Sequence, residues 1–286
     1  ETGDGQLHPD VEPMLAAWAE GVRESRGSGL VAARGEARSS AWISTPRTGT
    51  SFHYDSAFNL VLQVHGAKMF ELLPPSETVK LPLPPTGHPY YRQAIGAEPD
   101  HPRSLLFNLS SGDALVIPPL WAHQTASWEV GASISLNVWV DSALAGRQEG
   151  LTAFPLPLES SWPPPAFAGG VAAYLRSFLE AVGVPMRLVR ARWRLVRLSA
   201  AAQAQAAATD FGDLSAACGS AAGALEGVSA AGWARIGNRA GVAAALIVEL
   251  PAEARTLLAV DYADDVVLGT VGAVAAQRFV EACLTG

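Results

Sequence analysis

Residues 46–75 read PRTGTSFHYDSAFNLVLQVHGAKMFELLPP, and the fold prediction depends on this stretch. It contains two runs rich in β-branched, aromatic and other apolar residues, 58–64 and 68–73, with a turn residue, Gly66, between them. Similar short runs occur at residues 42–44, 114–117, 123–127 and 133–140. Short strands bounded by turn residues, with no helical period between them, predict a β-sandwich or barrel.

The chain changes character on both sides of these runs. Residues 10–24 place apolar side chains at helical spacing and predict an amphipathic helix, whereas residues 27–40 are rich in Gly, Ser and Arg and predict a loop. Residues 81–104 are rich in proline and predict a long ordered loop. We therefore expect an N-terminal helix and loop at 1–41, a β core at 42–150 and a C-terminal helical region at 151–286.

The C-terminal region is alanine-rich and helical in period. Apolar side chains recur at helical spacing from Val171 to Val182, which predicts a helix with a continuous apolar stripe. We expect a helical bundle that packs against the β core or against a second copy of the chain, which would give a homodimer. Residues 187–197 hold five arginines interleaved with apolar residues, which predicts an amphipathic helix with a solvated basic face rather than a nucleic-acid surface.

Composition excludes several classes of protein. The formal net charge of −7 argues against nucleic acid as the primary partner, because a protein that neutralises phosphates is usually basic. No apolar run approaches the ~20 residues needed to cross a bilayer, so we expect no transmembrane segment. Two cysteines, Cys218 and Cys283, are too few for a disulfide framework, and the sequence leaves open whether they pair.

The compartment is indicated only by weak features. Glu1, Thr2 and Gly3 resemble the remnant that signal-peptide cleavage leaves in a secretion vector, and Asn108 begins the one glycosylation sequon. These features favour the lumen of the secretory pathway or the extracellular space. A cytoplasmic or nuclear location is the alternative.

The chemistry is suggested by three side chains. If residues 53–55 are extended, His53 and Asp55 emerge on the same face and Tyr54 on the other. His123 follows a second predicted strand after a Gly112-Asp113 turn and supplies another imidazole. Two histidines and one carboxylate form a facial triad that leaves coordination positions open and suits non-haem iron(II).

The sequence around these ligands resembles the JmjC-type oxygenases of the cupin superfamily, notably the hypoxia-inducible-factor asparaginyl hydroxylase and its bacterial cupin-like relatives. The resemblance rests on the quoted stretch together with GDALVIPPLWAHQTAS at 112–127 and SISLNVWV at 133–140, which fall in family order. It covers residues 42–140, roughly a third of the chain. It implies a double-stranded β-helix (jelly-roll cupin) core, mostly β, followed by the C-terminal α-helical bundle.

The same resemblance implies two sets of site residues. The iron ligands would be His53, Asp55 and His123. The side chains that would line the 2-oxoglutarate pocket are Lys68, Thr50, Asn59 and Asn137. Lys68 would form a charge-assisted bond with the distal carboxylate of the cosubstrate. The aromatic residue that often completes this pocket has no mapped counterpart, and Trp42 is a candidate.

Simpler roles are open for several of these residues. Lys68 could be an exposed strand lysine, and Thr50 could be a turn residue after Gly49. The histidines outside the triad are expected at the surface and two tryptophans in packing: His65, His88, His101, Trp121 and Trp139.

The resemblance implies an Fe(II)- and 2-oxoglutarate-dependent dioxygenase, supported by ascorbate, that hydroxylates or demethylates a protein side chain and releases succinate and CO2. A protein or peptide is therefore the expected partner. Two other functions remain open: a cupin dioxygenase or isomerase that does not use 2-oxoglutarate, and a non-catalytic scaffold or binding module. An anchor such as Lys68 distinguishes the first, because an enzyme without 2-oxoglutarate has no need of it.

Overall fold

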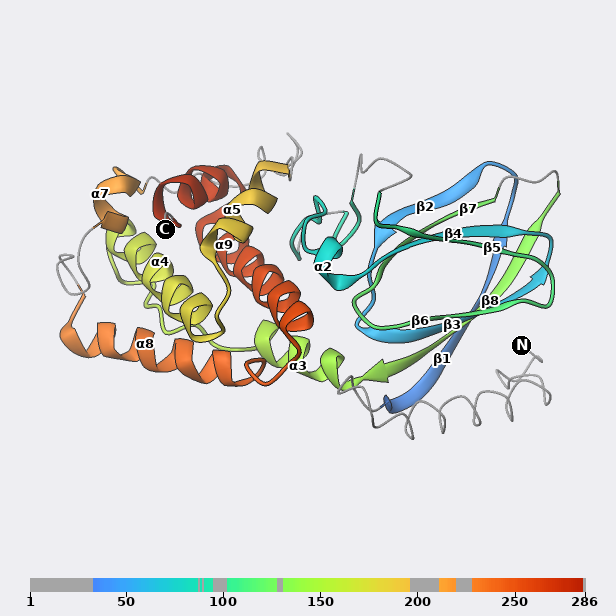
Figure 1. Ribbon diagram of the computed structural model, residues 1–286. Helices are drawn as coiled ribbons and strands as arrows, with labels where there is room; N and C mark the ends of the chain where they lie inside the picture. Colours follow the sequence, from blue (N-terminus) through green and yellow to red (C-terminus); the bar gives the residue numbers. More distant parts are fainter. Residues whose placement is uncertain are drawn as a thin grey trace.

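The computed structural model describes residues 33–86, 88, 90–94, 102–127, 131–195, 211–219 and 228–284 (Figure 1). The helix expected at residues 10–24 and the side chain of His101 lie outside these ranges. In Figure 1 the strands gather at one end of the molecule and most of the helices at the other. A β core followed by C-terminal helices is what the sequence predicted.

The β core consists of two antiparallel four-stranded sheets in the described part of the chain. One sheet has the order β1-β8-β3-β6 and the other β2-β7-β4-β5. The strands are β1 (Ala33–Ser44), β2 (Thr48–His53), β3 (Ala57–His65), β4 (Lys68–Leu73), β5 (Leu105–Leu109), β6 (Ala114–Ile117), β7 (Ala122–Ser127) and β8 (Ser133–Ser142). Val61, Phe70, Leu72, Leu109 and Ile117 form a buried apolar cluster from strands of both sheets.

Three strand predictions were wrong. The loop expected at residues 27–40 is strand from Ala33 onward, because β1 pairs along its length with β8. Backbone pairing with a neighbour outweighs a composition rich in Gly, Ser and Arg. Strands β2, which pairs with β7, and β5, which pairs with β4, were not predicted.

The proline-rich segment after β4 contacts both the β core and the helical half of the molecule. It follows the short helix α2 (Pro75–Thr78) and lies beside the long helix α9 (Ala252–Cys283) in Figure 1. At one end, the Ala94 N–H donates to Phe52 O on β2 at 2.7 Å. Further back, Asp265 on α9 accepts from Thr86 N at 2.6 Å and Thr86 Oγ1 at 2.8 Å.

His88 lies in this segment and is only 6% exposed, so the expectation of a surface position was wrong. Its Nδ1 accepts a hydrogen bond from Tyr90 N, and burial lowers the pKa of the imidazole. His65, by contrast, is exposed as expected.

The helical half contains α3 (Ala143–Thr152), α4 (Pro164–Ala181), α5 (Met186–Leu195), α7 (Leu214–Gly219), α8 (Ala230–Ala245) and α9. Helix α4 begins after Pro163, and α9 is broken at Gly272, whose φ of 76° is in the left-handed region. One buried apolar cluster contains residues from both halves, including Phe52 and Leu73 of the β core and Leu257 of α9. The bundle therefore packs against the β core.

The apolar stripe from Val171 to Val182 lies inside this bundle. Val171, Leu175 and Phe178 are 0% exposed, and the Phe178 ring stands edge-on to Tyr262 of α9 with centroids 5.0 Å apart. The stripe is therefore buried within one chain and is not available as a dimer interface. The expectation of a homodimer has no support from this stripe.

The prediction of a solvated basic face was wrong at Arg192 on α5. Its side chain is 2% exposed and bonds to Asp261, to Asp264 Oδ2 at 3.4 Å and to Val79 O at 3.3 Å. Through these bonds the buried guanidinium links α5, α9 and the segment after α2. Cys218 and Cys283, left open by the sequence, form a disulfide between α7 and the end of α9.

No described helix alone is long and apolar enough to cross a bilayer. Helices α4 and α5 together meet that test by length and composition, with a bend of 117° between them.

Candidate metal centre

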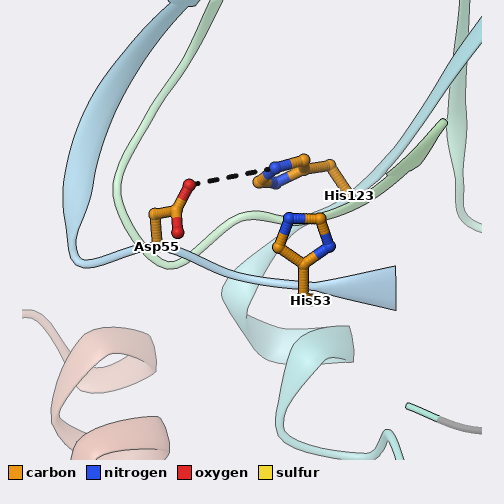
Figure 2. Close-up of side chains that lie close together, drawn as sticks. All are labelled: His53, Asp55 and His123. Atoms are coloured by element: carbon orange, nitrogen blue, oxygen red, sulfur yellow. Dashed lines mark ion pairs between the residues drawn. The ribbon is translucent and has the colours of Figure 1, made fainter. Parts of the chain in front are cut away.

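The three predicted metal ligands converge at one end of the β core. His53 is the last residue of β2 and pairs with His123 on β7, so adjacent strands bring the two imidazoles together. Asp55 follows two residues later, and its backbone oxygen accepts a hydrogen bond from Leu120 N at 2.7 Å. Ligand atoms from His53, Asp55 and His123 all lie within 4.8 Å of one another, and their side chains point toward a common point (Figure 2).

Hydrogen bonds orient both imidazoles for metal binding. His53 Nδ1 lies 2.8 Å from Ser51 O, and His123 Nδ1 lies 3.1 Å from Trp121 O. A carbonyl oxygen only accepts, so the protons reside on Nδ1 in the neutral rings. The Nε2 lone pairs are then free, which is the arrangement that metal-binding histidines use. The donor set therefore fits a divalent metal ion.

The charge state of His123 supports the same arrangement. Burial, followed by the neighbouring His53 imidazole, lowers the pKa of His123 to about 4, whereas Asp55 acts in the opposite direction. The ring is therefore neutral at neutral pH. His123 Nε2 and Asp55 Oδ2 are 4.0 Å apart, the pair joined by the dashed line in Figure 2. Because the ring is uncharged, we interpret this distance as the span between two ligand atoms rather than as an ion pair.

Trp139 on β8 holds the carboxylate of Asp55. Its Nε1–H donates to Asp55 Oδ2 at 3.1 Å. Trp139 was expected to serve only in packing, and that expectation was incomplete. A signal was available, because Trp139 lies two residues after Asn137 and therefore on the same face of its strand.

The triad opens into a cavity of about 210 Å³ between the two sheets. All four predicted cosubstrate residues line this cavity together with the triad: Thr50, Asn59, Lys68 and Asn137. Trp42, the candidate aromatic residue, also lines it but is 46% exposed. Phe70, Thr125 and Trp139 complete the lining and were missed, although Thr125 lies two residues after His123 on β7.

Lys68 is the cation of this cavity. It is 7% exposed, so it is not the exposed strand lysine that was the simpler interpretation. Its Nζ donates to Ser135 Oγ at 3.4 Å, and within the described residues it forms no ion pair. Burial lowers the pKa of Lys68. A buried ammonium without a carboxylate costs free energy, so the site is suited to an anionic ligand.

The polar neighbours of Lys68 are arranged in pairs. Thr50 Oγ1 and Thr125 Oγ1 lie 3.1 Å apart, and Asn137 Nδ2 donates to Asn59 Oδ1 at 3.0 Å. The first pair joins β2 to β7 and the second joins β3 to β8. Because these strands are hydrogen-bonded neighbours, the pairing of their backbones fixes the positions of the polar groups.

Comparison with known proteins identifies the β half. Residues 20–145 match the family model of the cupin-like domain. The chain carries a cupin-like domain. The resemblance to JmjC-type and cupin-like proteins that the sequence indicated is thereby confirmed.

Curated relatives match 34% to 40% of the chain. Lysine-specific demethylase JMJ31 of Arabidopsis thaliana is 34% identical over 113 residues, which cover 35% of this chain and 20% of that protein. tRNA wybutosine-synthesizing protein 4 of Aspergillus oryzae is 34% identical over 103 residues, 34% of this chain and 10% of that protein. Human HSPB1-associated protein 1 is 32% identical over 131 residues, 40% of this chain and 26% of that protein. The matches span about a quarter or less of the length of these relatives.

Proposed function

We propose that this protein is an Fe(II)- and 2-oxoglutarate-dependent oxygenase built on a double-stranded β-helix, and that it hydroxylates a carbon of a protein side chain. The balanced reaction is R–H + O2 + 2-oxoglutarate → R–OH + succinate + CO2. One oxygen atom enters the substrate and the other enters succinate. If the hydroxylated carbon is an N-methyl group, the product loses formaldehyde and the outcome is demethylation.

One observation carries the proposal: a single cavity contains both a facial triad and a buried lysine. His53, Asp55 and His123 supply two imidazole nitrogens and one carboxylate. Lys68 supplies an ammonium for a second carboxylate. An enzyme that did not use 2-oxoglutarate would have no need for the lysine. A scaffold would have no need for either set.

Each residue has a role that follows from its position. The triad would hold the iron, and iron with its cosubstrate supplies the activation of dioxygen. Lys68 would pair with the distal carboxylate of 2-oxoglutarate, a charge-assisted bond that sets the orientation of the cosubstrate. Thr50 and Asn59 offer hydrogen-bonding groups in the same cavity. Trp139 keeps the Asp55 carboxylate aimed at the metal position.

A protein substrate is favoured over nucleic acid by the net charge of −7, since phosphate backbones would be repelled. Among the relatives, one is named as a lysine-specific demethylase and another as an associate of HSPB1. Both names are compatible with a protein or peptide as the prime substrate.

The test is a succinate-release assay with Fe(II), 2-oxoglutarate, ascorbate and a peptide library. We expect succinate from wild type and none above background from Asp55→Ala, because the variant lacks the only carboxylate of the triad. A peptide product heavier by one oxygen or lighter by one methylene identifies hydroxylation or demethylation. Absence of succinate from an iron-loaded, folded wild type would leave a cupin independent of 2-oxoglutarate or a scaffold.

A further inference from the structure

A second cavity adjoins the metal centre. Its volume is about 360 Å³, and it shares Asp55 and Trp139 with the triad cavity. Its other polar lining consists of two arginines and two serines: Arg38, Arg92, Ser40 and Ser56. None of these four residues has a role in the reaction described above. A group bound in this cavity would lie next to the position of the metal.

The register of β1 places the two cavities next to each other along one face of this strand. Arg38 pairs with Trp139 and Ser40 with Asn137 across the β1–β8 ladder. Alternate residues of a strand point to the same face, so Arg38 and Ser40 share a face with Trp42, which lines the triad cavity. The inner face of β1 therefore leads from the predicted cosubstrate pocket into the second cavity.

Arg92 reaches this cavity from the segment that joins the two halves. Its backbone has a φ of 57°, a left-handed conformation that is uncommon for a residue other than glycine. The bond from Arg92 N to Pro84 O at 3.2 Å holds it there. Such strain persists only where the surrounding structure imposes it, and it clusters at ligand sites. The local backbone therefore fixes the direction in which the Arg92 side chain leaves the chain.

The Arg92 guanidinium is packed but not fully satisfied. Its central carbon lies 4.8 Å from the Tyr54 ring centroid and 4.6 Å from that of Tyr91. Its Nε is buried and has no hydrogen-bond partner among the described residues. Burial lowers the pKa of Arg92, and Tyr91, Asp265 and Asp55 oppose that change. A planar cation stacked in this way is suited to a carboxylate.

Of the carboxylates near the two arginines, two are engaged by other groups and the third is paired with Arg38. Asp265 accepts two hydrogen bonds from Thr86, and the charge of Asp55 would be taken up by a metal ion. Arg38 pairs with Asp141 at 2.7 Å, but both side chains are well exposed, at 68% and 41%, and such pairs contribute little. With metal bound, positive charge is in excess in the second cavity.

We propose that this second cavity binds an acidic side chain of a peptide substrate, so that Arg92 and Arg38 select a substrate with a carboxylate close to the carbon that is oxidised. The assignment rests on the proposed function for the oxidation itself. The recognition of the carboxylate depends on the cavity, its arginines and a bound metal ion, and not on the oxidation.

The test measures binding without cosubstrate. The full chain, loaded with Mn(II), is applied to a positional-scanning peptide array in matched Asp/Asn and Glu/Gln pairs. Succinate release with Fe(II) and 2-oxoglutarate is measured separately on the same preparation, so that failure of the oxygenase assignment is seen independently. We compare wild type with Arg92→Gln and Arg38→Gln. The matched control is Arg235→Gln, which removes an exposed arginine from α8 that pairs with Glu159.

We expect wild type and Arg235→Gln to bind the best acidic peptides roughly ten- to a hundredfold more tightly than their amide partners, as a charge-assisted bond implies. Arg92→Gln should lose most of this preference and Arg38→Gln part of it. Arg92→Lys keeps the positive charge but lacks the planar guanidinium, so it should retain part of the preference for acidic peptides. Partial retention in Arg92→Lys would show that the loss in Arg92→Gln is not caused by a folding defect. Equal binding of acidic and amide peptides by wild type, no binding of either, or a preference that survives in both glutamine variants would overturn the proposal. An acidic preference without succinate release would remove the oxygenase assignment and leave the carboxylate site.

Discussion

The hydrogen bonds around the metal centre explain why these particular side chains are ready to bind a metal. Main-chain oxygens of Ser51 and Trp121 accept from the Nδ1 groups of the two histidines, which leaves both Nε2 atoms free. Trp139 likewise orients Asp55, because its indole N–H donates a hydrogen bond to one carboxylate oxygen. The ligands are therefore oriented before a metal arrives, and less entropy is lost on binding.

Replacing Trp139 with phenylalanine tests this orientation. Trp139→Phe keeps an aromatic ring in the cavity but removes the hydrogen bond to Asp55, so metal affinity should fall roughly 10- to 100-fold, as for other outer partners of metal ligands. Affinity is measured by titrating Mn(II) into the metal-free chain. Trp162→Phe is the control, because that tryptophan is buried in the other apolar cluster and does not line the cavity. Equal affinities in wild type and Trp139→Phe would show that the hydrogen bond is not needed.

Individual residues were predicted from the sequence to different extents. The seven candidate residues that lie in the family motifs all line one cavity. They could be predicted because the motifs follow one another in the sequence in the order expected for the family. Arg92 could not be found in this way. Its contact with Tyr54 depends on how the segment after α2 folds back onto β2, and no period of two or of 3.6 encodes that path.

At the scale of elements, paired strands position the site and helices support it from one end. Strands formed from runs of β-branched, aromatic and other apolar residues, such as β3 and β4, were predicted because that composition is visible in the sequence. The first part of β1 was not, because its residues become a strand only through pairing with β8. Long-range pairing cannot be read from local composition.

Helix α4 is the central element of the bundle, and truncation of a large side chain on it should be costly. Phe178 is 0% exposed and contacts Tyr262, so Phe178→Ala should lower the free energy of unfolding by about 3–5 kcal/mol. Urea denaturation followed by circular dichroism gives the value. Val242→Ala on α8, where the side chain is 52% exposed, should change it by less than about 0.5 kcal/mol. A loss below 1 kcal/mol at Phe178 would mean that α4 does not hold the bundle together.

At the scale of the whole molecule, a buried polar cluster links the bundle to the β half. Arg192 and Trp193 of α5 contact Asp264 of α9, and Arg192 also donates to Val79 O. Burial raises the pKa of Asp264 to about 7, although Arg192 and the bond from Trp193 oppose the change. Burial also raises the pKa values of Asp261 and Asp265, so negative charge accumulates in the cluster only as the pH rises.

Stability should therefore depend on pH in a defined direction. Because the folded chain holds the Asp264 proton more tightly than the unfolded chain, this group stabilises the fold fully below about pH 4. Its contribution is lost as the pH rises through about 7, with an upper limit of about 4 kcal/mol. Asp264→Asn keeps an acceptor for Trp193 and should flatten the unfolding free energy between pH 4 and about 7. A variant with the same pH profile as wild type would assign the dependence to other groups.

The central claim is that one cavity holds both a metal and 2-oxoglutarate, and calorimetry tests it most directly. 2-Oxoglutarate is titrated into the full chain with and without Mn(II). We expect one equivalent to bind the metal-loaded wild type, much weaker binding without metal, and a roughly 30- to 1000-fold loss in metal-loaded Lys68→Ala, which leaves the distal carboxylate unpaired. Metal content should be unchanged in Lys68→Ala, because the lysine is not a ligand. Equal affinity in Lys68→Ala, or no binding to metal-loaded wild type, would contradict the account.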